Sequence, residues 1–158
     1  MFIIFFRSKG PMLVQYVDKG KTIDHDYFIN FCISPLVKAI NKQRPKSGTH
    51  GLKLLIDGAK PHTHSETINF IQSNGLLIID HPPYSPDLAP CDYWLFDLVK
   101  QRLNEQEEFE DEKSLAKSVT KILNEIHHNE YIKTFDKYLE RLKMCIDAVE
   151  EYFEHNMK

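Results

Sequence analysis

Short apolar runs and longer amphipathic stretches alternate along the chain and predict a mixed α/β organisation. Two runs rich in Ile, Val and aromatic residues, MFIIFFRS and MLVQYVDKG, flank the turn KGP and predict a hairpin over residues 1–20. The next stretch, DYFINFCISPLVKAINKQ, predicts a helix with Thr22 or Asp24 as its cap and a bend at Pro35. Its apolar positions recur at helical spacing, at Tyr27, Phe31, Cys32, Leu36 and Ile40.

Two nearly continuous apolar runs, LKLLI at 52–56 and GLLIID at 75–80, predict short strands buried on both faces of a sheet. A helix is predicted between them, over residues 65–73. This alternation of strand, helix and strand is typical of parallel pairing with helices packed on the sheet. Asp57 directly follows the first run, so we expect it at the sheet edge where open α/β folds bind ligands.

A proline-rich elbow, HPPYSPDLAP at residues 81–90, leads into the helical pattern DYWLFDLVKQRL. Its four prolines fix four φ angles within ten residues and predict a rigid turn. We expect Asp87 to order this turn through its backbone. Asp92 falls in the first helical turn, where the helix dipole favours an ionised acid. Two carboxylates of this kind can share a hard cation such as Mg²⁺. The alternative is that Asp92 only caps the helix and Asp57 only forms a turn.

Two amphipathic helices are predicted in the last third, over residues 111–126 and 130–153. Core packing accounts for the apolar stripes of both helices. The stripes are marked by Leu115, Val119, Ile122 and Ile126 in the first helix, and by Phe135, Tyr138, Leu142, Ile146 and Phe153 in the second.

Composition suits one globular domain with a sizeable core, because the chain has 158 residues of which 42% are hydrophobic. The net charge of −3 argues against a general nucleic-acid binder. However, residues 1–50 hold eight Lys or Arg and three acids, whereas residues 104–158 hold eight and fourteen. Any phosphate contact should therefore lie in the first third.

No apolar run approaches the roughly 18 residues that span a membrane. The three cysteines, Cys32, Cys91 and Cys145, have no metal-type spacing. We therefore expect an intracellular, thiol-reduced chain.

Two motifs resemble signatures of the mariner family of DNA transposases. LLIDGAKPHTH, at 54–64, is similar to the family's LLHDNARPHT, and YSPDLAPCDYWLF, at 84–96, resembles YSPDLAPSDYHLF. As in the family, 34 residues separate Asp57 from Asp92. Further stretches resemble family segments along essentially the whole chain, namely FFRSKG, DKGKTID, KQRPKSGT and FDKYLERLKMCIDAVEEYFE.

The resemblance implies an α/β fold of the RNase H-like (DDE/D transposase) type, a mixed sheet flanked by helices. Residues 1–103 would form a partial catalytic domain, and residues 104–158 the C-terminal helical part of the same domain. In this family three Asp residues bind two divalent metals, Mg²⁺ or Mn²⁺, to cut transposon ends out of DNA and join them to a target. By motif position Asp57 is the second acid and Asp92 the third, which makes both catalytic and metal-binding.

The implied partners are transposon-end and target DNA, with a homodimer as a further possibility and no membrane or small-molecule substrate. A functional copy would act in the nucleus. In the family the first acid lies upstream of FFRSKG, so we expect a chain truncated at its N-terminus and inactive in isolation. The alternative is a non-catalytic remnant that acts as an interaction or dimerisation module through its C-terminal helices.

The first motif departs from the family at three positions. Ile56, Gly58 and Lys60 stand where the family has His, Asn and Arg. Loss of the Asn side chain removes a hydrogen-bonding group beside the acid, a kind of change that typically costs about 10–100-fold in affinity or activity.

A zinc site is a further alternative, formed by Asp57 with His62 and His64. The spacing suggests no additional ligand, which weakens this reading.

Overall fold

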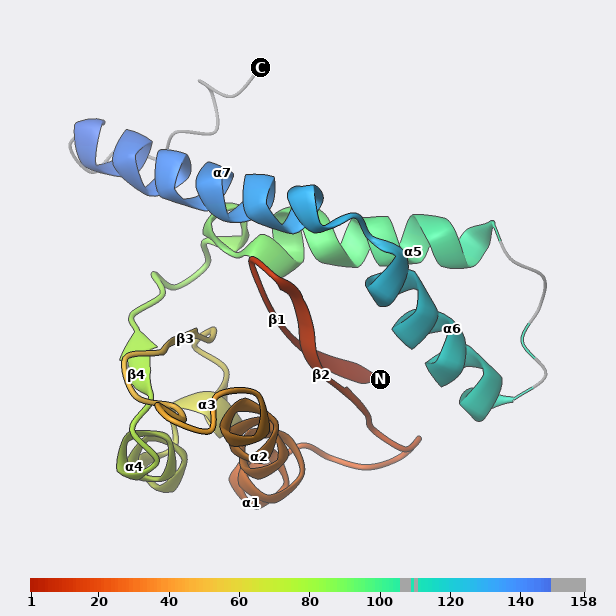
Figure 1. Cartoon of the computed structure of the whole chain (residues 1–158), viewed down its shortest axis with the longest axis horizontal. Helices are drawn as coiled ribbons and strands as arrows, with labels where there is room; N and C mark the ends of the chain where they lie inside the picture. The colour runs from red at the N-terminus through yellow and green to blue at the C-terminus, as the bar shows by residue number, and fades with distance from the viewer. Residues whose placement is uncertain (106–108, 110, 149–158) are drawn as a thin grey trace. The chain divides into compact units, whose positions relative to one another are not determined.

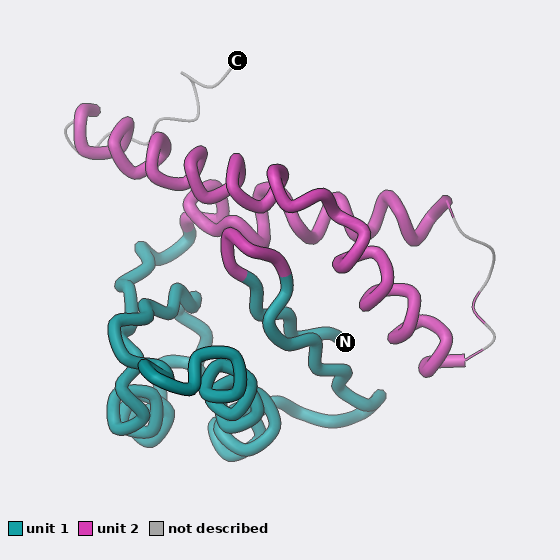
Figure 2. The backbone as a smooth tube through the Cα atoms, viewed as in Figure 1, with its two compact units in different colours: residues 1–6, 11–84 teal, residues 7–10, 85–158 magenta. Residues whose placement is uncertain are grey.

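A computed structural model describes residues 1–105, 109 and 111–148 of the chain (Figure 1). They form two compact units, each described separately below (Figure 2). The first unit holds residues 1–6 and 11–84, and the second holds residues 7–10 and the described residues from Ser85 onward. The expected division of one domain into a partial catalytic part, residues 1–103, and a C-terminal helical part, residues 104–158, stays a prediction.

The predicted hairpin is present, with β1 at Phe2–Arg7 and β2 at Gly10–Tyr16. Its open end is closed by two hydrogen bonds, because Met1 and Val17 each donate a main-chain N–H to the other's carbonyl, at 3.2 and 2.9 Å. Ile3 and Phe5 pack on the core of the first unit. Alternate side chains of a strand point to opposite faces, and Phe2 accordingly contacts Tyr16, with ring centroids 5.3 Å apart.

The long helical stretch begins where predicted, because the Asp24 carboxylate accepts the Tyr27 N–H at 2.8 Å and caps α1 (His25–Tyr27). A π-helical segment, Phe28–Ile33, then leads into α2 (Ser34–Gln43). Pro35 therefore stands in the first turn of α2, directly after the π-helical segment, and the predicted bend there stays a prediction.

The core of the first unit lies between this helical stretch and the segment that follows it. Its buried members are Phe28, Cys32, Ile33, Leu36, Val37, Ile40, Ile71 and Leu76. Phe31, which the pattern placed in the core, is exposed and instead stacks on Tyr27, with ring centroids 4.8 Å apart.

The second half of the first unit is a strand–helix–strand unit, in the order β3 (Lys53–Leu55), α3 (Lys60–Thr63), α4 (Ser65–Ser73) and β4 (Leu77–Ile79). β3 and β4 pair in parallel, with Lys53 opposite Leu77 and Leu55 opposite Ile79, which confirms the predicted pairing. The prediction that both strands are buried on both faces was wrong, because Lys53 and Leu77 are exposed. Leu54 and Ile78, at the middle of the two strands, are partly buried against the core.

The turn into β4 depends on a glycine. Gly75 has a φ of 77°, in the left-handed region that favours glycine, and a Cβ there would lie 3.2 Å from the Thr49 hydroxyl oxygen. That hydroxyl donates a hydrogen bond to the Asn74 carbonyl, which ties the loop before β3 to the end of α4. The two strands are thereby held together just outside their ladder.

The second unit is helical. After a 3₁₀ turn at Pro86–Leu88, a π-helical segment (Cys91–Leu95) continues into α5 (Phe96–Asn104), and α6 (Glu112–Glu125) and α7 (His128–Asp147) follow. Asp111 and Ser114 form a capping box for α6, and the Tyr131 hydroxyl on α7 donates to the Leu123 carbonyl on α6 at 2.8 Å. None of the described helices is long and apolar enough to cross a membrane.

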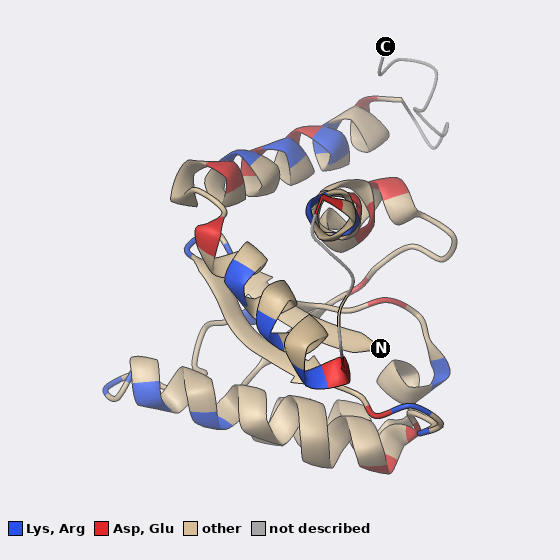
Figure 3. Cartoon of the chain, turned by 90° about the vertical axis from the view of Figure 1, so that its right-hand side faces the viewer, with Lys and Arg blue, Asp and Glu red and all other residues tan. Residues whose placement is uncertain are grey.

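The predicted stripes of the last two helices are confirmed in part. Val119, Ile122, Ile126 and Tyr138 are buried, whereas Ile146 is 77% exposed and Phe153 lies outside the described residues. Acidic and basic residues alternate along α7, as the red and blue segments of its ribbon show (Figure 3).

Candidate functional site

Asp57 lies two residues beyond β3, at the carboxyl end of the parallel β3–β4 pair. Its Oδ1 accepts the Ala59 main-chain N–H at 2.9 Å, and this local turn leads directly into α3. The same oxygen lies 2.5 Å from Nδ1 of His62, which is on α3. The side chain is 61% exposed, so it is fixed by these bonds while it remains open to solvent.

The environment keeps Asp57 ionised. Partial burial raises the pKa of its carboxyl, but the Ala59 N–H and the neighbouring His62 and His81 outweigh burial and leave the pKa below its ordinary value. An ionised carboxylate only accepts hydrogen bonds, so the proton of the His62 contact belongs to Nδ1 of the imidazole. The imidazole ring is itself held against Phe28, with ring centroids 4.3 Å apart. Asp57 is therefore a preoriented anion.

A pocket of about 180 Å³ opens beside this carboxylate and is lined by residues from the ends of both strands. Asp80 lines it and directly follows β4, as Asp57 follows β3. Sequence reasoning missed Asp80, although an acid after the second apolar run is the same signal that singled out Asp57. The pocket thus has a carboxylate from each strand of the parallel pair.

Gly58 is not required by packing, because a Cβ built on it meets nothing within 4 Å. The position next to Asp57 therefore has room for the Asn side chain of the related motif.

Asp92 lies in the second unit, in the first turn of the π-helical segment. Its main-chain N–H donates to the Ala89 carbonyl at 2.9 Å, and the Cys91 thiol lies 3.9 Å from its Oδ2. The carboxylate is exposed. The prediction that Asp92 starts a helix directly after the elbow is confirmed.

The elbow before Asp92 is clamped by the buried Arg141 of α7. The guanidinium donates a hydrogen bond to the Asp87 carbonyl, and its central carbon lies 4.1 Å from the centroid of the Tyr93 ring. The Tyr93 hydroxyl in turn donates to the Thr134 carbonyl on the same helix, at 2.8 Å. Residues on both sides of Asp92 are therefore tied to α7, and Asp87 acts through its main chain as predicted.

Protonation of Tyr93 keeps this clamp intact at neutral pH. Burial raises the pKa of Tyr93 to about 12, although the nearby Arg141 lowers it. The phenol therefore remains a hydrogen-bond donor to Thr134 across the physiological range.

The zinc alternative at Asp57, His62 and His64 is not supported by the geometry. His62 faces Asp57, whereas His64 stacks on His25, with ring centroids 3.7 Å apart. Within the part of the chain that the structure describes, the cluster with metal-ligand spacing contains His64 but not Asp57.

Residues 3–116 match the family model described as DDE superfamily endonuclease. Over 156 residues the chain is 26% identical to the mariner Mos1 transposase of Drosophila mauritiana, and over 154 residues it is 23% identical to the human histone-lysine N-methyltransferase SETMAR. Each alignment covers 98% of this chain but only 45% and 22% of these relatives, respectively, so the chain spans less than half of either protein.

A crystal structure of the catalytic domain of Mos1 mariner transposase has a similar fold, with a TM-score of 0.86 and 26% sequence identity. The match covers 97% of this chain and 75% of that domain.

We predict that Asp57 makes stability depend on pH in the acid range. The pKa of Asp57 is lowered in the folded state, so its ionised form stabilises the fold. This contribution to the free energy of unfolding is full above the ordinary Asp pKa and is lost as pH falls through the pKa of the folded state. In urea unfolding measured from pH 6 to pH 2, the free energy of unfolding should fall less steeply for Asp57→Asn than for the parent chain. Asp97→Asn on α5 is the control, and identical pH profiles for the parent chain and Asp57→Asn would contradict the assignment.

A second prediction concerns the Arg141 clamp. Arg141→Ala should lower the free energy of unfolding by about 2–4 kcal/mol, because it removes a buried charged donor and its aromatic contact. Arg141→Lys should lose less free energy of unfolding than Arg141→Ala but more than the parent chain, since an ammonium lacks the planar group of N–H donors that a guanidinium has. Lys143→Ala, an exposed position on the same helix, should change stability by less than about 0.5 kcal/mol. An equally small change for Arg141→Ala would show that the elbow does not depend on the clamp.

Proposed function

The chain belongs to the DDE superfamily endonucleases, and from this premise we propose that it works as part of the catalytic domain of a mariner-like cut-and-paste DNA transposase. The predicted RNase H-like fold and the resemblance to mariner transposases are confirmed by the matches to Mos1. The activity, the metal and the DNA partner belong to the proposal, because the chain covers less than half of those relatives.

The observation that carries the proposal is the ionised, oriented carboxylate of Asp57 beside a pocket at the carboxyl end of a parallel strand pair. Its donors to Oδ1 leave Oδ2 available for an external ligand. Carboxylate oxygens are the donors that Mg²⁺ and Mn²⁺ prefer, so the residues present fit a hard cation. The Mos1 catalytic domain has been solved with Mn and with Mg.

In this proposal Asp57 and Asp92 hold the divalent cations, and His62 is a positioning residue for Asp57. When bound, two cations supply Lewis-acid stabilisation of the attacking and leaving oxygens in a displacement at phosphorus. The chain's part is to present fixed carboxylates: hydrogen bonds from Ala59 and His62 orient Asp57, and the clamped elbow orients Asp92. A residue held in this way loses little conformational freedom when it binds a ligand.

DNA is the proposed substrate, and the basic first third offers contacts to it. Lys38, Lys42 and Lys46 are exposed along α2 and the loop after it. Such lysines bind phosphates without reading sequence, and their contribution weakens as salt rises. Mos1 has been solved in a paired-end complex with a transposon end, and we infer that this chain likewise acts on transposon DNA in the nucleus.

A second candidate function is an interaction module, and one feature of α7 favours it. Ile132, Leu139 and Ile146 recur one heptad apart and are 37%, 62% and 77% exposed. Apolar residues at this spacing form the seam along which helices of two copies associate. Dimerisation through α7 is compatible with transposase function and would also suit a chain that has lost catalysis.

Manganese binding separates the two candidates. We predict that Mn²⁺ titrated into the chain by calorimetry binds, and that Asp57→Asn and Asp92→Asn each weaken binding by about tenfold or more, comparable with losses at other metal sites. Asp97→Asn should leave the affinity unchanged, and Asp80→Asn reports whether the second carboxylate of the pocket contributes. Binding, rather than DNA cleavage, is the readout because it depends on the acids of this chain alone.

Unchanged Mn²⁺ affinity in Asp57→Asn, or no binding by the parent chain, would leave the interaction module as the surviving function.

A further inference from the structure

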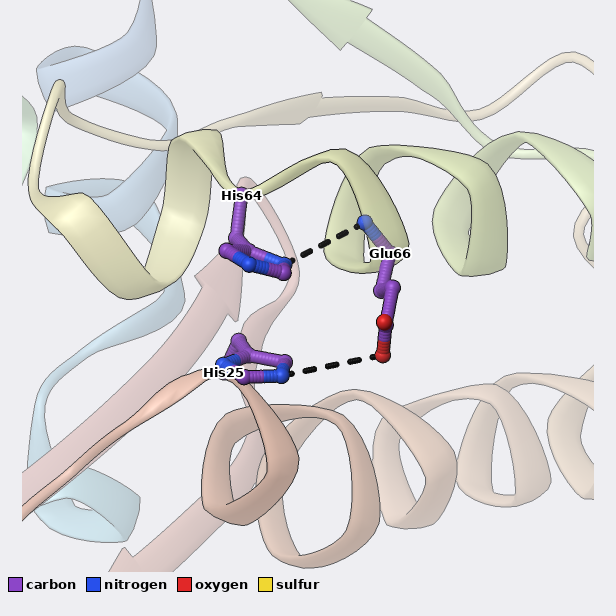
Figure 4. Close-up of side chains that lie close together, drawn as sticks. All are labelled: His25, His64 and Glu66. Carbon is purple, nitrogen blue, oxygen red and sulfur yellow. Dashed lines mark hydrogen bonds and ion pairs between the residues drawn. The ribbon is translucent and has the colours of Figure 1, made fainter.

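A second group of metal-ligating side chains lies in the first unit and is not used by the proposed transposase chemistry. His25 is the first residue of α1, His64 is the N-cap of α4, and Glu66 lies in the first turn of α4. One ligand atom from each of these residues lies within 4.8 Å of the other two. The helices that contribute them start side by side, although 38 residues separate His25 from His64 in the sequence (Figure 4).

The three side chains present their ligand atoms on one side of a stacked pair of rings, and a bound ion would require the two rings to tilt toward each other. The two imidazole rings are stacked, with a centroid distance of 3.7 Å and an interplanar angle of 17°. His64 turns Nδ1 toward Glu66 and accepts its main-chain N–H at 3.4 Å, while His25 turns Nε2 toward the Glu66 carboxylate, 3.6 Å from Oε2. Figure 4 shows both nitrogens on the side of the rings that faces Glu66.

The available lone pairs suit a cation. Nδ1 of His64 accepts the Glu66 main-chain N–H, so this nitrogen carries no proton. Metal binding there would replace one long hydrogen bond with a metal–nitrogen bond. Nε2 of His25 is 3.6 Å from Glu66 and 3.8 Å from Asp26, distances too long for strong hydrogen bonds. Neither nitrogen is committed to a short protein contact, and the Glu66 side chain is 64% exposed, so an ion has access.

We propose that His25, His64 and Glu66 bind Zn²⁺, with Asp26 or water as the fourth ligand. Two imidazoles and one carboxylate are a donor set that suits Zn²⁺, whereas Mg²⁺ and Mn²⁺ favour oxygen ligands. The site is therefore chemically distinct from the carboxylates at Asp57 and Asp92. A bound ion would join the starts of α1 and α4, and α4 follows directly on the segment that carries His62.

The site has a defined relation to the Asp57 network. His62 and His64 are two residues apart but face different partners, Asp57 and His25. Zinc at His64 would thus restrain the short α3 segment at its C-terminal end, while the bond from His62 restrains the Asp57 turn at its start. Zinc therefore has a structural role in the first unit, and no reaction step is assigned to it.

The test is metal binding by the full chain, measured as Zn²⁺ calorimetry and as the visible absorption of Co²⁺, which reports tetrahedral ligation. His25→Asn and His64→Asn should each weaken Zn²⁺ binding by about tenfold or more, and Glu66→Gln should also weaken it. Asn at position 64 keeps a side chain that caps α4, so a loss of metal is separated from a loss of the helix.

His127→Asn is the matched control, because His127 caps α7 in the same way, accepting the Asn129 N–H through Nδ1 at 3.3 Å. It should bind Zn²⁺ like the parent chain. Zinc should raise the melting temperature of the parent chain and of His127→Asn, but not that of His64→Asn. Binding should weaken in acid, because protons compete with the metal for its nitrogen ligands.

Two results would overturn the proposal. One is Zn²⁺ affinity in His64→Asn equal to that in His127→Asn. The other is binding that survives all three substitutions of the cluster but disappears in Asp57→Asn, which would place the ion at the carboxylate pocket. Absence of Zn²⁺ binding by the parent chain would reject the site outright, while leaving the Mn²⁺ test of the transposase proposal unaffected.

Discussion

The parallel pairing of β3 with β4 is the constraint on which the candidate chemistry depends. It brings the carboxyl ends of two strands to one edge and places Asp57 and Asp80 around the same pocket. A carboxylate at this edge would otherwise be a flexible, fully hydrated surface group. The turn through Ala59 and the bond from His62 convert Asp57 into an ionised side chain with a fixed direction. Features as distant as Gly75 and Thr49 matter because they hold the same two strands together.

In the second unit, different contacts fix the backbone around Asp92. Among the described residues of this unit the backbone around Asp92 is held by prolines and by a buried cation on a helix far along the chain. Arg141 binds the carbonyl of Asp87 and the face of Tyr93, so it holds the chain on both sides of Asp92.

Sequence alone predicted the features that depend on local pattern. The hairpin, the helix over residues 65–73, the Asp24 cap and the places of Asp57 and Asp92 follow from apolar periodicity and from proline and glycine positions. What it missed depends on contacts between distant segments. Arg141 reaches a residue 54 positions earlier, and His25 meets His64 only after the chain has folded. The exposure of Leu77 and Ile146 was missed for a related reason, since an apolar pattern does not reveal which face is left uncovered. Asp80 could have been predicted, because it directly follows the second apolar run as Asp57 follows the first.

The central proposal is that Asp57 and Asp92 both bind divalent cations, and paramagnetic broadening by Mn²⁺ tests it most directly. In ¹⁵N-labelled protein, the amide signals of Gly58 and Tyr93 report on the two acids that precede them. The account predicts that both signals broaden as Mn²⁺ is added, that Asp57→Asn abolishes the broadening at Gly58, and that Asp92→Asn abolishes it at Tyr93. Broadening at Gly58 with an unchanged Tyr93 signal would contradict the account.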